Sequence, residues 1–235
     1  MNSDVKTRIK TLARWLYEAR YPVFLTGAGI STESGLSDFR GPDGIWTRQE
    51  QGLPPKRMSK PWDQVAPNEG HYALVELQNL GKLKFLISQN VDNLHLKSGI
   101  KPENLAELHG NTSLLRCRSC GRNVNRSLNL TMCLCGGRLE DSVVNFGQPL
   151  PEHELEQSFE HSRKADMFVV LGSSLTVTPA ADMPGEALRN VGTLVVVNHQ
   201  STPYDHKAHL RFTEGVGEVL PRVVKQLKGY MGLFE

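Results

Sequence analysis

The sequence predicts an α/β fold, a parallel sheet with helices on both faces, joined to a small cysteine-bearing module. Three observations predict it: short strands that are apolar on both faces, helical patterns that alternate with them, and one segment that holds all four cysteines. Strands that are apolar on both faces belong in a sheet that is covered on both sides. At 235 residues, the chain is long enough to bury such a core as one domain with a small insert.

The strands and helices are placed by their apolar periodicity. The first helix is clear because Val5, Ile9 and Leu12 recur at helical spacing, and Pro67 is expected in the first turn of another. The expected strands are 22–26, 84–88, 167–171 and 193–197. The expected helices are 4–20, 67–80, 151–164, 181–190 and 216–228. Two stretches, 41–65 and 112–146, break the alternation of strands and helices.

Charge and hydropathy exclude some classes of function. A formal charge of +2, from 27 basic and 25 acidic residues, gives no strong reason to expect nucleic acid as the main ligand. The N-terminus has no apolar run fit for secretion, and no stretch approaches the roughly 20 apolar residues of a membrane span. A cytoplasmic, or at least intracellular, protein is expected, and its oligomeric state is not indicated.

The cysteines have the spacing of a zinc site. Cys117 and Cys120 are separated from Cys133 and Cys135 by twelve residues. Four thiolates hold zinc in a tetrahedron and supply folding energy that so short a segment lacks. Disulfides are the alternative, but intracellular thiols stay reduced and cysteines one residue apart are poorly placed to bond each other. Four protein ligands leave no open position, so the zinc is expected to be structural.

The segment VFLTGAGIST resembles a dinucleotide-binding fingerprint that is incomplete. Gly27, Ala28 and Gly29 follow a strand and would let the backbone approach a pyrophosphate, while Ser31 and Thr32 offer hydroxyls. Thr32 stands where the third glycine of G-x-G-x-x-G is expected. The alternative is a tight turn of any α/β protein. Taken alone, the pattern does not decide between a nucleotide-binding loop and such a turn.

Polar residues at the ends of other strands are candidates for the same ligand. Gln89, Asn90, Val91 and Asp92 follow the second strand, where a hydride-transfer enzyme would normally show an acidic residue that holds the ribose. A ribose and an amide-bearing ring would satisfy these groups, although a polar turn cap is the alternative. Glycine, hydroxyl and amide groups follow the third and fourth strands at Gly172, Ser173, Ser174 and Asn198.

Two further segments carry chemistry. Phe39 could shield a reactive carbon and Arg40 suits a phosphate, or the two could form an ordinary surface contact. His109 follows an apolar stretch and is a candidate general base, although a lone histidine is more often structural.

The motifs GAGIS, DFRGPDGIW, QNVD, LHGN, the paired cysteines, VVNFG, LGSSLTVTPA and VVNHQ occur in one order. In this the chain resembles the sirtuins (Sir2 family), which are NAD-consuming protein deacylases, over about residues 5 to 228. It is most similar to the branch that contains the chromatin-associated nuclear sirtuins, class IV. Because sirtuins cleave NAD, the resemblance explains why no hydride-transfer acidic residue is present.

The resemblance implies a role for each candidate residue. The NAD-binding residues would be Gly27, Ala28, Gly29, Ser31, Thr32, Phe39, Arg40, Trp46, Gln89, Asn90, Val91, Asp92, Gly172, Ser173, Ser174, Asn198, Gln200 and Val216. The catalytic residues would be Asn90 and His109, and the edge that pairs with a substrate peptide would be Asn145, Phe146 and Gly147. Residues 1–40, 66–111 and 147–235 would form the Rossmann-like NAD-binding domain. Residues 41–65 and 112–146 would form the small domain, which includes the cofactor-binding loop and the zinc module.

The implied activity is NAD-dependent removal of an acyl group from lysine, with NAD as co-substrate, structural zinc, and acylated-lysine proteins or peptides as partners. Mono-ADP-ribosyl transfer to a protein and an NAD-binding scaffold with little turnover remain as alternatives. The chain departs from the family at Asn93, where glycine is usual, at Ser37, where proline is usual, and at Gln148, a common glutamate. Asparagine tolerates a positive φ, so the turn at Asn93 is expected to survive.

Overall fold

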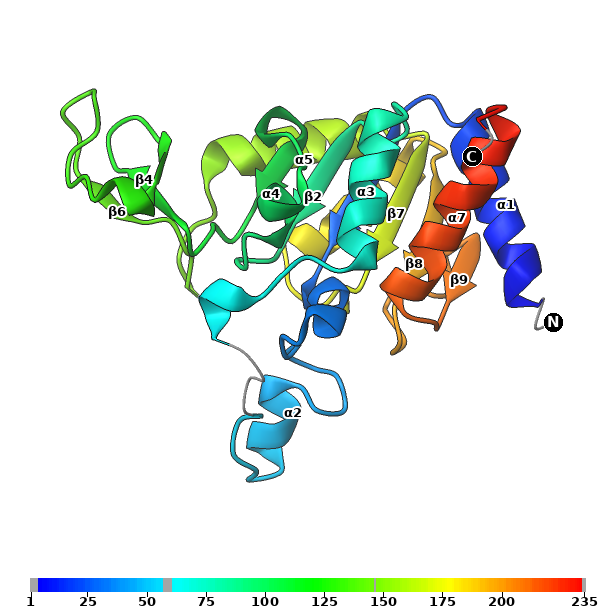
Figure 1. Ribbon diagram of the computed structural model, residues 1–235, viewed down its shortest axis with the longest axis horizontal. Coiled ribbons are helices and arrows are strands. Elements are labelled where there is room, and N and C mark those ends of the chain that lie inside the picture. The colour runs from blue at the N-terminus through cyan, green and yellow to red at the C-terminus, as the bar shows by residue number, and fades with distance from the viewer. Residues whose placement is uncertain (1–3, 57–60, 146, 234–235) are drawn as a thin grey trace.

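The computed structural model describes residues 4–56, 61–145 and 147–233. Its centre is a six-stranded sheet in the order β3-β2-β1-β7-β8-β9, in which all neighbouring strands are parallel (Figure 1). The strands are β1 (Pro22–Thr26), β2 (Phe85–Ser88), β3 (Leu105–Glu107), β7 (Met167–Leu171), β8 (Thr193–Val197) and β9 (Leu210–Phe212). The four strands predicted from the sequence form the centre of the sheet, and the short strands β3 and β9 at its edges were missed.

The central strands are buried on both faces, as their composition predicts. In β1, Phe24 packs into one hydrophobic cluster, whereas Val23 and Leu25 pack into another on the opposite face. All three side chains are fully buried. Alternate residues of a strand point to opposite faces, so an apolar run needs a helical layer on each side.

Helices cover both faces of the sheet. One cluster contains residues of α1 (Val5–Glu18), α3 (Glu69–Asn79) and α7 (Val216–Tyr230), and the other packs α5 (Glu152–Lys164) and α6 (Met183–Arg189). The short helices α2 (Ile45–Glu50) and α4 (Leu94–Ser98) lie in connections between strands. Within the described ranges, no helix has the length and apolar character that a membrane crossing requires.

Two helices, α3 and α6, begin two residues later than predicted. Pro67 lies outside α3, because Asn68 is the N-cap and its side chain accepts from the backbone N–H of Gly70 (2.9 Å). Such a cap satisfies an N–H that has no partner within the helix. The region predicted as a helix over 181–190 begins as a 3-10 turn, Ala180–Asp182, and becomes α-helical at Met183.

The four cysteines belong to a small module built on a separate antiparallel sheet in the order β5-β4-β6. Cys117 ends β4, and the other three cysteines lie in the loops of the module. Its strands are β4 (Leu114–Cys117), β5 (Asn123–Asn125) and β6 (Leu139–Asp141). In Figure 1 this sheet lies at the end of the molecule opposite the two termini. The predicted fold class, a Rossmann-like parallel sheet with helices on both faces plus a small zinc-binding domain, is confirmed. The residue limits of the two domains stay a prediction.

Candidate functional site

The carboxyl ends of β1, β2, β7 and β8 border one cavity of about 1030 Å³. Open parallel sheets bind their ligands at this edge. Every described residue that the sequence nominated for NAD or peptide lines it: Gly27, Ala28, Gly29, Ser31, Thr32, Phe39, Arg40, Trp46, Gln89, Asn90, Val91, Asp92, His109, Asn145, Gly147, Gly172, Ser173, Ser174, Asn198, Gln200 and Val216. Phe146 lies outside the described residues. The structure therefore brings the nominated residues together, while the role of each stays a prediction.

Glycines allow the loop after β1 and the loop after β7 to pack directly against each other. A Cβ on Gly27 would lie 2.8 Å from the carbonyl oxygen of Gly172, and one on Gly29 would lie 2.7 Å from the Gly172 Cα. Gly172 has a φ of +63°, and a Cβ on it would lie 2.4 Å from the backbone nitrogen of Ile30. Since each neighbour is backbone, a larger residue could not be accommodated by moving a side chain. This packing brings both loops to the cavity wall.

Asp92 joins the glycine loop to the segment after β2. Ser31 Oγ donates to Asp92 Oδ2 (2.6 Å), and Asn90 Nδ2 donates to Ser31 Oγ (3.1 Å). The other carboxylate oxygen accepts from the backbone N–H of Leu94 (2.9 Å), which is the turn-capping role that the sequence left open. All three of the linked side chains, Ser31, Asn90 and Asp92, are buried. The carboxylate thus orders the cavity wall and remains at the cavity surface.

The turn after Asp92 has the conformation that its sequence predicts. Asn93 has a φ of 66°, in the left-handed region that asparagine tolerates. Its side-chain oxygen accepts from Asn111 Nδ2 (2.9 Å), a contact that the sequence did not indicate. The prediction that this turn survives without glycine is confirmed.

His109 is oriented by a backbone carbonyl. Its Nδ1 lies 2.8 Å from the carbonyl oxygen of Gln89. A carbonyl oxygen only accepts, so Nδ1 must carry the hydrogen, and in the neutral ring Nε2 is then an acceptor. The backbone oxygen of His109 accepts from Val144 N (2.9 Å), which fixes the loop from the opposite side. An imidazole held in this tautomer at a cavity wall is suited to accept a proton through Nε2.

Arg40 contributes positive charge to the same cavity. Its guanidinium lies over the Trp46 ring, 4.2 Å from the ring centroid, and the Phe39 and Trp46 rings are 5.1 Å apart. Burial lowers the pKa of Arg40 from its usual value. A planar cation stacked on an aromatic ring keeps its N–H groups free for an anion such as phosphate.

The remaining strand ends supply amides and hydroxyls. Gln89 Nε2 donates to Ser173 Oγ (2.8 Å), and Asn198 Nδ2 donates to the Gln200 carbonyl oxygen (3.0 Å). At the nominated peptide edge, Asn145 N donates to the side chain of Gln148 (2.8 Å). The donor set of the cavity, which combines amides, hydroxyls and one guanidinium, has the chemistry that two riboses and a pyrophosphate require.

The four cysteines can hold a tetrahedral metal ion. Their Sγ atoms all lie within 4.8 Å of one another, with 3.5 Å between Cys117 and Cys135 and 3.8 Å between Cys120 and Cys133. A tetrahedron of thiolates around zinc has edges of about 3.8 Å. These separations exceed the roughly 2.05 Å of a disulfide bond, and all four cysteines are free in the structure. The Cys-x-Cys spacing therefore fits a closed, structural zinc site.

Sequence reasoning missed a buried histidine pair near the site. His71 of α3 and His95 of α4 have ring centroids 5.1 Å apart, and His95 Nε2 lies 2.9 Å from Thr26 Oγ1 at the end of β1. Burial lowers the pKa of His71 to about 3 and that of His95 to about 4. No local motif marks either residue, because the pair forms only when α3 and α4 pack together.

A parallel sheet with a glycine-lined cavity at its carboxyl edge, joined to a four-cysteine module, defines the class: a nucleotide-binding α/β protein with a structural metal. Within that class, the Sir2 family model matches residues 54–179. The chain belongs to the Sir2 family. Its assignment to the class IV branch stays a prediction.

Known relatives match most of the chain. The chain is 41% identical over 235 residues to the NAD-dependent protein deacetylase SRT1 of Arabidopsis thaliana, across 95% of this chain and 50% of that protein. It is 36% identical to NAD-dependent protein deacetylase 1 of Bradyrhizobium diazoefficiens, across 93% of this chain and 96% of that protein. A solved Sir2 complex with a p53 peptide and NAD+ superposes with a TM-score of 0.73 at 33% identity, across 96% and 99% of the two chains. The chain spans about half the length of its plant relatives.

Proposed function

We propose that this protein is an NAD-dependent protein lysine deacylase that transfers the acyl group of acyl-lysine to ADP-ribose and releases nicotinamide. The observation that carries the proposal is His109, held by Gln89 so that Nε2 can accept a proton at the wall of a dinucleotide-sized cavity. The names of the relatives and the ligands of the solved complex point to the same reaction. The role of each residue rests on its chemistry and position.

The cavity fits NAD as a co-substrate, which supplies an anomeric carbon with nicotinamide as its leaving group. Ser31, Asn90 and Asp92 form one hydrogen-bonded unit that would hold the nicotinamide side. Arg40 would pair with phosphate, and the rings of Phe39 and Trp46 would exclude water. Further NAD-binding positions would be Gly27, Ala28, Gly29, Thr32, Gln89, Val91, Gly172, Ser173, Ser174, Asn198, Gln200 and Val216.

The acyl-lysine peptide would pair with the edge at Asn145 and Gly147, which line the cavity on the side of His109. Gln148 now accepts the Asn145 N–H, so a substrate backbone would have to displace its side chain. The acyl oxygen of the substrate lysine would replace nicotinamide at the anomeric carbon of NAD. His109 Nε2 would then remove a proton from a ribose hydroxyl so that the hydroxyl attacks the acyl carbon, and the lysine would leave.

Two alternatives make different products. In mono-ADP-ribosyl transfer a protein side chain attacks the anomeric carbon of NAD in place of the acyl oxygen. An oriented His109 favours acyl removal because direct transfer has less need of a base there. An NAD-binding scaffold would turn over neither. Mass spectrometry of an acyl-lysine peptide incubated with NAD separates the three by acyl loss, an ADP-ribose adduct or no change.

The experiment that tests the role of His109 separates two steps. Nicotinamide departure needs no proton removed from the ribose, whereas the later attack on the acyl carbon does. His109→Ala should therefore depress acyl removal about 10²- to 10⁴-fold, while peptide-dependent exchange of labelled nicotinamide into NAD persists. The variant must first be shown to fold and to bind NAD. If exchange and acyl removal fall together, His109 acts in binding or in the first step.

We also propose that the metal is zinc and that the protein works in the cytoplasm. A reducing compartment keeps the thiols of Cys117, Cys120, Cys133 and Cys135 available as ligands.

A further inference from the structure

One buried amide, that of Asn111, connects two segments of the cavity wall. Asn111 Nδ2 donates to Asn93 Oδ1 (2.9 Å) and to Glu107 Oε1 (2.7 Å). Its own side-chain oxygen accepts from Ser113 N (2.8 Å), and the residue is fully buried. Both amide hydrogens and the oxygen are therefore used, so the amide has one orientation. It joins residues 89–93, beside the proposed nicotinamide site, to the loop that carries His109.

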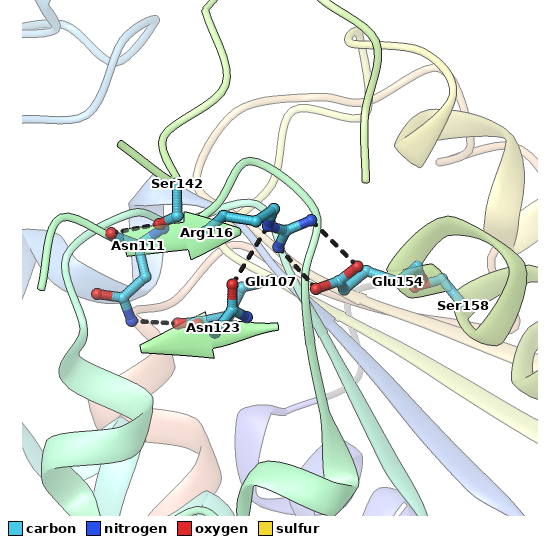
Figure 2. Close-up of polar contacts among 7 residues, drawn as sticks. All are labelled: Glu107, Asn111, Arg116, Asn123, Ser142, Glu154 and Ser158. Carbon is cyan, nitrogen blue, oxygen red and sulfur yellow. Dashed lines mark hydrogen bonds and ion pairs between the residues drawn. The ribbon is translucent and has the colours of Figure 1, made fainter. Parts of the chain in front are cut away.

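The loop that carries His109 and Asn111 is also bound by Ser142, as Figure 2 shows. Ser142 Oγ accepts from Asn111 N (3.0 Å) and donates to the Asn111 carbonyl oxygen (2.7 Å). Gly110 has a φ of +76°, and a Cβ there would lie 1.9 Å from the Ser142 carbonyl oxygen. The backbone on either side of Asn111 is thus fixed against the segment that leaves the metal module.

Glu107, the last residue of β3, is a buried carboxylate that the proposed reaction does not use. Burial raises its pKa to about 7, while the hydrogen bond from Asn111 acts in the opposite direction. Nearby Arg116 forms a bidentate pair with Glu154 (2.7 and 3.3 Å), drawn in Figure 2. Within the described part of the chain, Asn111 supplies the hydrogen bond that the Glu107 side chain accepts. A buried carboxylate with one good donor holds that donor firmly.

The contact between Asn111 and Asn93 depends on a residue in which this chain departs from the expected family pattern. It stands where the family resemblance leads one to expect glycine, and its left-handed backbone is one that glycine adopts without strain. Glycine at this position would keep the turn and lose the acceptor for Asn111. The side chain of Asn93 thus adds a contact without being needed for the turn.

We propose that Asn111, held between Glu107 and Asn93, is a positioning residue that keeps the segment 89–93 and the His109 loop in one geometry. This rests on the proposed function, in which the segment 89–93 serves nicotinamide release and His109 serves the later step. The amide of Asn111 would keep these two segments in a fixed relative position. The first step depends on the segment with Asp92, and the second depends on His109.

The test removes the Asn93 acceptor alone. Asn93→Gly should lower the ratio of acyl removal to nicotinamide exchange about 3- to 10-fold, the usual effect of one hydrogen bond, with the KM for NAD little changed. Asn129→Gly is the matched control. Asn129 is an exposed asparagine of the metal module with a φ of 50°, so this change replaces the same residue in the same backbone conformation. An unchanged ratio, or an equal fall in both steps, overturns the proposal.

Two further measurements do not depend on Asn93→Gly being active. Hydrogen exchange of amides 107–113 should be faster in Asn93→Gly than in Asn129→Gly, and equal rates overturn the proposal even if native protein turns nothing over. Inactivity of the native protein in both reactions would instead overturn the proposed function. Glu107→Gln keeps an acceptor for Asn111 and should keep more of the native ratio than Glu107→Ala. Equal ratios in the two variants reduce Glu107 to a packing role.

Discussion

The buried histidine pair should make the fold sensitive to acid. His71 and His95 have pKa values of about 3 and about 4 in the folded protein, against an ordinary value of 6.5. Both are therefore neutral when folded, and the unfolded chain takes up protons first as the pH falls through 6.5. Stability that is present above this pH is lost as the pH falls toward 4.

The magnitude follows from these values and is opposed by Glu107. Between about pH 7 and about pH 5, the linkage relation gives a loss of about 2 kcal/mol for each histidine. The pKa of Glu107 is raised from 4.5 to about 7, so the folded protein holds this proton more tightly. Glu107 then contributes a gain of about 2 kcal/mol over the same interval. The three groups together should cost about 2 kcal/mol, since one histidine is offset by the carboxylate.

Urea denaturation at the two pH values, with zinc present throughout, measures this effect. Glu107→Gln removes the opposing group, so the stability lost on acidification should increase by about 2 kcal/mol over the native value. His95→Gln should reduce it by about the same amount, and its amide can still bond Thr26. Groups common to all three proteins cancel in these differences. If Glu107→Gln and the native protein lose equal stability, the burial argument for Glu107 is wrong, and an unchanged loss in His95→Gln refutes it for His95.

Two other changes test the metal and the nicotinamide side. Cys120→Ala leaves three ligands, so it should lower the zinc content below one per chain and increase proteolysis of residues 112–146. Leu134→Ala is the control and should change neither, because the Leu134 side chain lies between two ligands in the sequence and is 93% exposed. Asp92→Asn replaces a carboxylate that accepts hydrogen bonds from Ser31 and Leu94. In steady-state kinetics it should weaken productive NAD binding or cleavage about 10- to 200-fold, the usual effect of losing a charge-assisted hydrogen bond. Kinetics equal to those of the native protein would leave Asp92 with a turn-capping role alone.

The centre of the sheet and the metal module could be predicted because their signals are local. Runs of three to five consecutive apolar residues predict the strands that are buried on both faces, and cysteine spacing alone predicts four ligands. Strands β3 and β9 have three residues each, Leu105–Glu107 and Leu210–Phe212, and both contain a charged residue. Three residues are too few to show a period of two, so the two edge strands could not be predicted from the sequence.

The contacts that order the site could not be predicted in the same way. The sequence indicates that His109, Asp92 and the glycine loop contribute to one ligand site, because strand ends share an edge of the sheet. It does not indicate that Asn111 meets Asn93 across 18 positions, since no motif encodes a side-chain contact between two loops. From the sequence, Asn93 is expected only to tolerate the turn where glycine is usual. In the folded protein, its side chain accepts a hydrogen bond from Asn111.

The metal module and the loop that carries His109 are joined by a short stretch of backbone, so the metal is expected to influence the position of that loop. Within the module, β4 pairs with β6 so that Cys117 lies opposite Leu139 and Leu115 lies opposite Asp141. The chain leaving β6 continues directly to Ser142, which bonds Asn111, and to Val144, which bonds His109. A metal that binds Cys117 and Cys135 fixes where β6 begins, and so where these two contacts fall. If the metal affects the proposed reaction, we expect the effect to act through the position of this backbone.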